Sequence, residues 1–170
     1  DETYLGAFEA GVRGRKTNKK ALIAVAAQED GRGIGRIRMK RIHDASSQSL
    51  HPFIKDAIEP DSTVHTDGGE GYSGINTMGY KHKITVLQKN KESASTLLPR
   101  VHRVVSLLKR WLLGTHQGGI SESHLDYYLD EFTFRFNRRT SMHRGKLFYR
   151  LIQQSVITEP KPFKQMIKHV

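Results

Sequence analysis

The sequence predicts an α/β domain in which a mixed five-stranded sheet is flanked by helices. Three observations support this prediction. Strand-like segments fill the first 42 residues, strands then alternate with helical segments as far as residue 87, and apolar residues recur at helical spacing from residue 97 onward. A chain of 170 residues is long enough to bury a core. We expect one domain over residues 1–155 and a peripheral tail over residues 156–170.

The first 42 residues predict three antiparallel strands. Residues 1–6 alternate in polarity, residues 21–28 form an apolar run, and residues 34–42 alternate again. The glycine-bearing segment 29–33 between the last two has the composition of a hairpin turn. Because the chain begins directly in a strand and without Met, we expect a piece of a longer protein whose first strand is cut short at its start.

The middle of the chain alternates between helix and strand. A helix is predicted after Asp44, a suitable N-cap residue, with apolar residues at helical spacing until Pro60 stops it. A strand over residues 63–66, a short helical segment over 71–78 and a strand over 83–87 follow. Residues 88–96 are polar and predict a mobile loop.

The last third of the chain predicts helices. In the helix over residues 97–113 one apolar stripe is expected in the core, formed by Val101, Val105, Leu108 and Leu112. A different face of this helix carries His102, Ser106 and Lys109. Ser121 is expected to cap a helix that runs to Arg139, and a short last helix covers residues 147–154.

Composition favours a nucleic acid partner. The chain has 28 Lys and Arg against 17 Asp and Glu, a net charge of +11, which is typical of proteins that bind polyanions. A basic protein that only binds RNA passively is the alternative. The absence of cysteine excludes disulfides and thiolate ligands, so any metal must be held by oxygen or imidazole. No apolar run is long enough for a membrane span, and we expect a soluble, cytoplasmic protein.

Asp67 and His102 indicate a metal-dependent site. Asp67 closes a predicted strand, and His102 lies 35 positions later on a predicted helix in a basic surrounding. The order of elements is that of the ribonuclease H-like fold, in which neighbouring strands would bring Asp1 close to Asp67. Two hard divalent cations between such side chains could activate an attacking oxygen and stabilise a leaving one in phosphodiester displacement.

Four ordered segments identify a family resemblance. They are DETYLG at residues 1–6, HTDG at 65–68 with Gly71 and Tyr72 following, LLKRWLLGT at 107–115 and YLDEFTFRFNRR at 128–139. Together they resemble the bacterial insertion-sequence transposases that carry an ISXO2-like DDE transposase domain, of the IS1595 type. The resemblance extends from residue 1 to about residue 154.

The resemblance implies a DNA transposase that cuts double-stranded DNA at element ends and joins the freed 3′ hydroxyls to target DNA with Mg2+ or Mn2+ in a two-metal site. Carried over by position, Asp1 and Asp67 match the two catalytic aspartates, His102 the third metal residue and Lys109 a basic residue that follows it. It also implies a homodimer in the DNA complex and a place in the bacterial cytoplasm, associated with the nucleoid. An N-terminal DNA-binding region, expected in such proteins, is not present in this sequence.

Alternatives stay open for each of these residues. His102 departs from the usual glutamate; neutral imidazole suits Mn2+ better than Mg2+, so we expect a preference for Mn2+. His102 could instead be a surface histidine, with the third ligand drawn from Glu92, Glu122 or Glu131. Asp1 could be a frayed terminal residue and Asp67 part of a simple Asp-Gly turn. The whole domain could be a non-catalytic, basic nucleic-acid-binding remnant.

Basic side chains on the predicted helices are candidates for DNA contact. We expect Lys109 and Arg110 to bind backbone phosphates, although cations on an exposed helix face are usually only solvated. Three arginines near residue 138 could also bind DNA or could complement the dipole at the end of their helix: Arg135, Arg138 and Arg139.

Overall fold

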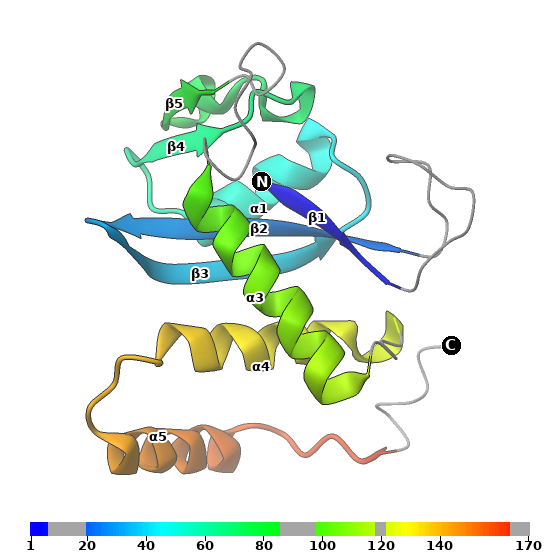
Figure 1. The fold of residues 1–170 in the computed structure, drawn as a ribbon, viewed down its shortest axis with the longest axis vertical. Helices are drawn as coiled ribbons and strands as arrows, with labels where there is room; N and C mark the ends of the chain where they lie inside the picture. The colour runs from blue at the N-terminus through cyan, green and yellow to red at the C-terminus, as the bar shows by residue number, and fades with distance from the viewer. Residues whose placement is uncertain (7–19, 86–97, 118–121, 164–170) are drawn as a thin grey trace. The chain divides into compact units, whose positions relative to one another are not determined.

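The computed structural model describes residues 1–6, 20–85, 98–117 and 122–163, and divides the chain into two compact units (Figure 1). The first unit comprises residues 1–120 and the second residues 121–170. Each unit is described by itself. The domain boundary near residue 155 stays a prediction.

The first unit contains the three predicted antiparallel strands. β1 (Glu2–Leu5), β2 (Ala21–Asp30) and β3 (Gly33–Ile42) form a sheet in the order β1-β2-β3, with β2 in the centre. β2 is the most apolar strand and holds four consecutive buried residues, which explains its central place. The ladder continues past β1, because the Val25 amide donates to the Asp1 carbonyl at 2.8 Å.

The prediction of a single five-stranded sheet is wrong for the residues that the structure describes. β4 (Thr63–Thr66) and β5 (Lys81–Ile84) form a separate two-stranded parallel sheet. β4 bonds to β5 and β1 bonds to β2, so the connection between the sheets is made by side chains and not by a ladder. The mixed α/β class itself is confirmed.

One apolar cluster joins the two sheets. α1 (Ser47–Ala57) contributes three buried residues to it, and β2, β4 and the 3-10 segments η1 (Glu70–Tyr72) and η2 (Ile75–Met78) supply others. The cluster consists of Ala24, Leu50, Phe53, Ile54, Val64, Tyr72, Ile75 and Tyr80. The Tyr72 hydroxyl also donates to a Glu2 carboxylate oxygen at 2.7 Å, which ties η1 to β1.

The start of α1 differs from the prediction by two residues. Ser46 is the N-cap residue, and Asp44 lies just before it. The Asp44 carboxylate accepts hydrogen bonds from the Ser46 amide and the Ser49 hydroxyl, both at 2.9 Å. These bonds hold the pKa of Asp44 well below its usual range. Asp44 therefore organises the approach to the helix without capping it.

The long helix α3 (Pro99–His116) packs against β2 (Figure 1). Its buried residues are Val104, Leu108 and Leu112, which recur every four positions. Val101 and Val105, which the sequence placed in the core with Leu108 and Leu112, are only half-buried. The buried line therefore follows the i, i+4 ridge through Val104, and the predicted stripe was displaced toward one side of it.

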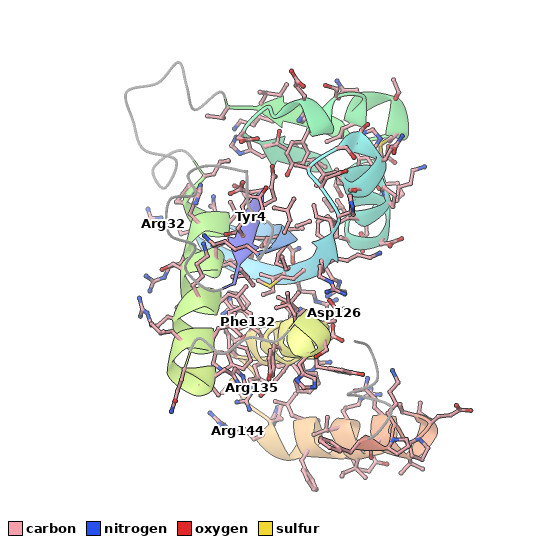
Figure 2. All side chains as sticks on the ribbon, turned by 90° about the vertical axis from the view of Figure 1, so that its right-hand side faces the viewer. Tyr4, Arg32, Asp126, Phe132, Arg135 and Arg144 are labelled. Atoms are coloured by element: carbon pink, nitrogen blue, oxygen red, sulfur yellow. The ribbon has the colours of Figure 1, made fainter. Side chains whose placement is uncertain are left out.

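The second unit contains η4 (Glu122–His124), α4 (Leu125–Asn137) and α5 (Arg144–Ile157). α4 buries Leu125, Leu129, Phe132 and Phe136, and Figure 2 labels Phe132 and Arg135 on it. α5 is longer than the predicted 147–154 helix and has no buried residue. The predicted cap Ser121 and the loop over residues 88–96 lie outside the described residues.

Replacing Ile23 with valine is expected to lower the free energy of unfolding by about 1 kcal/mol, because it removes one methyl group from a fully buried site. The measurement is urea denaturation, in which the midpoint falls while the slope stays constant. Ile84→Val is the matched control, since Ile84 is 53% exposed. Equal effects of the two substitutions would contradict the placement of Ile23 in the core.

Candidate functional site

The structure brings Asp1 and His102 together. Asp1 is fixed by backbone bonds to Val25 of β2, and His102 projects from the first turns of α3. The distance between Asp1 Oδ2 and His102 Nε2 is 3.6 Å. The other carboxylate oxygen of Asp1 accepts a hydrogen bond from the Glu2 amide at 2.9 Å, so Oδ2 is the oxygen directed at the imidazole. The side chains are 15% and 31% exposed, respectively.

The Nε2 atom of His102 is buried without a hydrogen-bond partner among the described residues. Burial lowers the pKa of His102, and the Asp67 carboxylate opposes this shift. A neutral imidazole can present a lone pair at Nε2. Such a lone pair beside a carboxylate oxygen can be shared by a cation, whereas the other tautomer directs an N–H at the Asp1 carboxylate.

Asp67 follows β4 at the start of a turn. Its Oδ1 accepts a hydrogen bond from the Gly69 amide at 3.0 Å, and Gly68 between them has φ = 81°, which glycine adopts without strain. The negative charge of Asp67 acts on the His102 imidazole and opposes the lowering of its pKa by burial. No group of three or more potential metal ligands is formed by the residues that the structure describes. Asp1 and His102 are in contact at 3.6 Å.

Sequence reasoning missed two residues that hold the Asp67 turn. Thr66 is 1% exposed, and its hydroxyl accepts a hydrogen bond from the Gly68 amide at 3.1 Å. The same hydroxyl lies 2.8 Å from Nε2 of His82 on the neighbouring strand β5. The alternation of β4 could have indicated that Thr66 points inward with Val64. His82 carried no such signal, because a partner 16 residues away is set by strand register.

Lys109 is exposed on α3, two turns after His102 and about 10 Å further along the helix axis. Partial desolvation lowers the pKa of Lys109, and the Lys20 ammonium adds to this effect. Lys20 immediately precedes β2, the strand against which α3 packs. Arg110 is also exposed. Lys20 thus places a second positive charge near Lys109, and the sequence did not reveal this.

The arginines of the second unit make contacts near the end of α4. The Arg138 guanidinium lies 3.9 Å from the centre of the Phe134 ring, and that of Arg139 lies 4.0 Å from the centre of the Phe136 ring. Arg139 also donates to the Phe136 carbonyl at 2.8 Å. This bond joins Arg139 to a carbonyl at the end of its own helix, which is the alternative to DNA binding that the sequence left open.

The three glutamates proposed as alternative ligands have different outcomes. Glu92 lies outside the described residues, and Glu122 opens η4. Glu131 forms an ion pair with Arg135 at 2.7 Å one helical turn later. Glu131 is thus engaged on the surface of α4, and His102 remains the candidate that lies beside Asp1.

The unfolding free energy is expected to fall as the pH drops below about 6.5. Burial is the main cause that lowers the pKa values of His65, His82 and His102. The unfolded chain then binds more protons than the folded chain, so this contribution is complete above about pH 6.5 and is lost on acidification. Urea midpoints at pH 7.5 and 5.5 measure the effect. A His65→Gln/His82→Gln variant should show a smaller difference, and equal wild-type midpoints would contradict the prediction.

Comparison with protein families places the chain among transposase domains. It belongs to the ISXO2-like transposase domain family, also designated IS1595, whose model matches residues 1–137. The match includes Asp1, Asp67, His102 and Lys109 and stops at the end of α4. This confirms the resemblance found in the sequence and indicates a transposase-related function with DNA as partner. Searches of curated proteins and of solved structures found no significant match.

The helices in the described part of the chain were also compared with the length and hydropathy of a membrane span. Not one of them is long and apolar enough to cross a bilayer.

Proposed function

We propose that this domain is the catalytic core of a DDE-type DNA transposase, which cleaves phosphodiester bonds at element ends and transfers the strands to target DNA. The observation that carries the proposal is the buried Nε2 atom of His102, which has no hydrogen-bond partner in the described structure and lies 3.6 Å from the Asp1 carboxylate. Two side chains that can share a cation are expensive to bury together without one. Family membership supplies the reaction class.

A divalent metal site at three residues is part of the proposal. Asp1 and Asp67 supply carboxylate oxygens and His102 an imidazole nitrogen, a mixed set that suits Mn2+ better than Mg2+. A metal bound there would activate the attacking oxygen and stabilise the leaving one, with two cations in the proposed site. The lowered pKa of His102 favours the neutral imidazole, which has a lone pair on one of its two ring nitrogens.

The other residues bind and orient the substrate in this proposal. Lys109, with Lys20 nearby, attracts a backbone phosphate toward the first unit, and Arg110 adds charge on the same helix. The Thr66 hydroxyl fixes the turn that carries Asp67. Arg138 and Arg139 are proposed as further phosphate contacts that remain cationic while stacked on phenylalanine rings.

The ribonuclease H-like fold is part of the proposal. Three antiparallel strands, a helix, a parallel strand pair and a long later helix follow the order expected for it. A homodimer in the DNA complex and association with the bacterial nucleoid are further expectations from the family resemblance.

A second candidate is a basic DNA-binding remnant that has lost its chemistry. It is favoured by the absence of a three-ligand group in the described residues and by the histidine in place of an acid. Both candidates require salt-dependent DNA binding, so binding alone does not separate them.

The test is cleavage and strand transfer by the protein on labelled DNA that carries the ends of its element. Reactions contain Mn2+, Mg2+ or EDTA, and the products are resolved on denaturing gels. The proposal expects cleavage with Mn2+, less with Mg2+ and no cleavage with EDTA. Tight DNA binding without cleavage under any metal condition would overturn it in favour of the non-catalytic remnant.

A further inference from the structure

β3 is a strongly basic edge strand. Between Gly33 and Ile42 it carries four cations and no carboxylate, and all four side chains are exposed: Arg36, Arg38, Lys40 and Arg41. β3 is the outer strand of the sheet, on the opposite side of β2 from β1 (Figure 1). Arg32 adds a further charge in the turn before it, where Figure 2 labels its side chain. None of these residues belongs to the site described above.

Two of these side chains share one face of the sheet, and a third lies next to them along the strand. Arg38 pairs with Ala26 and Lys40 with Ala24, and both alanines belong to or pack against the cluster that α1 covers. Arg36, two residues before Arg38, follows an irregularity in the ladder at which its amide donates to the Gln28 side chain at 3.0 Å. Residues two apart on a strand are separated by about 7 Å. Arg36, Arg38 and Lys40 therefore form a row of cations along β3.

Two of the carboxylates near this row are already paired. Lys40 Nζ lies 3.0 Å from Asp56 of α1, which neutralises the end of the row that the helix covers. Glu29, in the hairpin, pairs with Arg100 of α3 at 2.9 Å. Arg36 and Arg38 lie between these two pairs along the strand and are exposed. They form the positive centre of the edge.

The register relates this edge to the candidate site. Asp1 exchanges backbone hydrogen bonds with Val25, and Val25 pairs with Met39, which lies between Arg38 and Lys40. Two strand spacings, or about 10 Å, thus separate Asp1 from this part of β3. Because neighbours along a strand point to opposite faces, Arg38 and Lys40 lie on the face of the sheet opposite to that of Asp1, so this surface is separate from the candidate site.

We infer that the outer edge of β3 is a second DNA-binding surface, on which Arg36 and Arg38 hold successive backbone phosphates. Arginine suits this role because its planar guanidinium donates two parallel hydrogen bonds to a phosphate. Charges on an edge strand also prevent sheets from pairing with one another, and this alone would explain exposed cations there. The inference rests on the proposed function in one respect, which is that the polyanion is DNA.

The test compares the wild-type protein with an Arg36→Gln/Arg38→Gln variant. Affinity for a labelled DNA duplex is measured by fluorescence anisotropy between 50 and 200 mM salt, after circular dichroism has shown that the variant is folded. The slope of log K against log salt is negative, and each lost phosphate contact reduces its magnitude by about 0.9. The magnitude of the slope should therefore decrease by roughly 2 in the variant. The affinity at 100 mM salt should fall about tenfold or more.

Lys55→Gln/Arg144→Gln is the matched control, because it removes the same charge from exposed helix positions. Its slope should stay within about 0.5 of the wild-type value. A β3 variant that matches the wild type or this control would overturn the inference. So would unchanged DNA binding combined with weaker binding to polyglutamate, which would indicate an acidic protein partner.

Metal-dependent cleavage is measured in parallel at saturating DNA. Wild-type protein that binds but does not cleave would overturn the proposed function, while the comparison of slopes would still decide on the β3 surface. Cleavage by the β3 variant should approach the wild-type rate once DNA is saturating, because Arg36 and Arg38 lie outside the candidate site.

Discussion

Asp67→Asn is expected to reduce metal-dependent DNA cleavage by at least about 10³-fold while DNA affinity is retained. The substitution keeps the size of the side chain and an oxygen that can accept the Gly69 amide, so the turn after β4 is preserved. It removes the negative charge that acts on His102. A 10³-fold loss corresponds to about 4 kcal/mol of transition-state stabilisation, a magnitude typical of a lost metal-dependent contribution.

The matched control for this experiment is Asp61→Asn. Asp61 is exposed and has φ = 62°, a conformation that asparagine also adopts readily. It should cleave DNA at the wild-type rate. DNA affinity measured in EDTA should be equal or slightly higher for Asp67→Asn, since a negative charge near the substrate has been removed. Near-normal cleavage by Asp67→Asn would exclude Asp67 from the site.

β1, β2 and β3 could be predicted from the sequence because each has a local pattern, whereas β5 covers residues 81–84 and not the predicted 83–87. Residues 1–6 alternate in polarity and residues 21–28 form an apolar run, and the structure contains strands there. The helix α3 was also predicted, but Val104 is buried in place of Val101 and Val105. The three valines are equally apolar, so the sequence pattern did not distinguish them. Only the packing of α3 against β2 decides which valine is buried.

The division into two sheets could not be read from local pattern. Whether β4 continues the sheet beside β1 depends on hydrogen bonds between segments about 60 residues apart in the chain. The pairing of Thr66 with His82 has the same origin. The four proposed site residues were instead taken from the sequence motifs and the family resemblance: Asp1, Asp67, His102 and Lys109. The family match over residues 1–137 includes all four positions.

His102→Glu is expected to change the metal preference of cleavage from Mn2+ toward Mg2+. The wild-type imidazole is a softer donor than a carboxylate and is kept neutral chiefly by burial. Glutamate would restore an all-oxygen donor set beside Asp1, which suits the harder Mg2+. The ratio of cleavage rates with Mg2+ and Mn2+ should rise by at least about tenfold, whereas His102→Ala should lose about 10- to 100-fold with both metals.

His43→Glu is the control for added charge, because the His43 side chain is 93% exposed and contacts Asp44. It should leave the Mg2+ to Mn2+ ratio unchanged. A ratio that is also unchanged in His102→Glu, together with normal activity of His102→Ala, would show that His102 is a helix-surface histidine. The unpaired Nε2 beside Asp1 argues against that outcome, since a surface histidine with no ligand role would gain from turning this atom toward water.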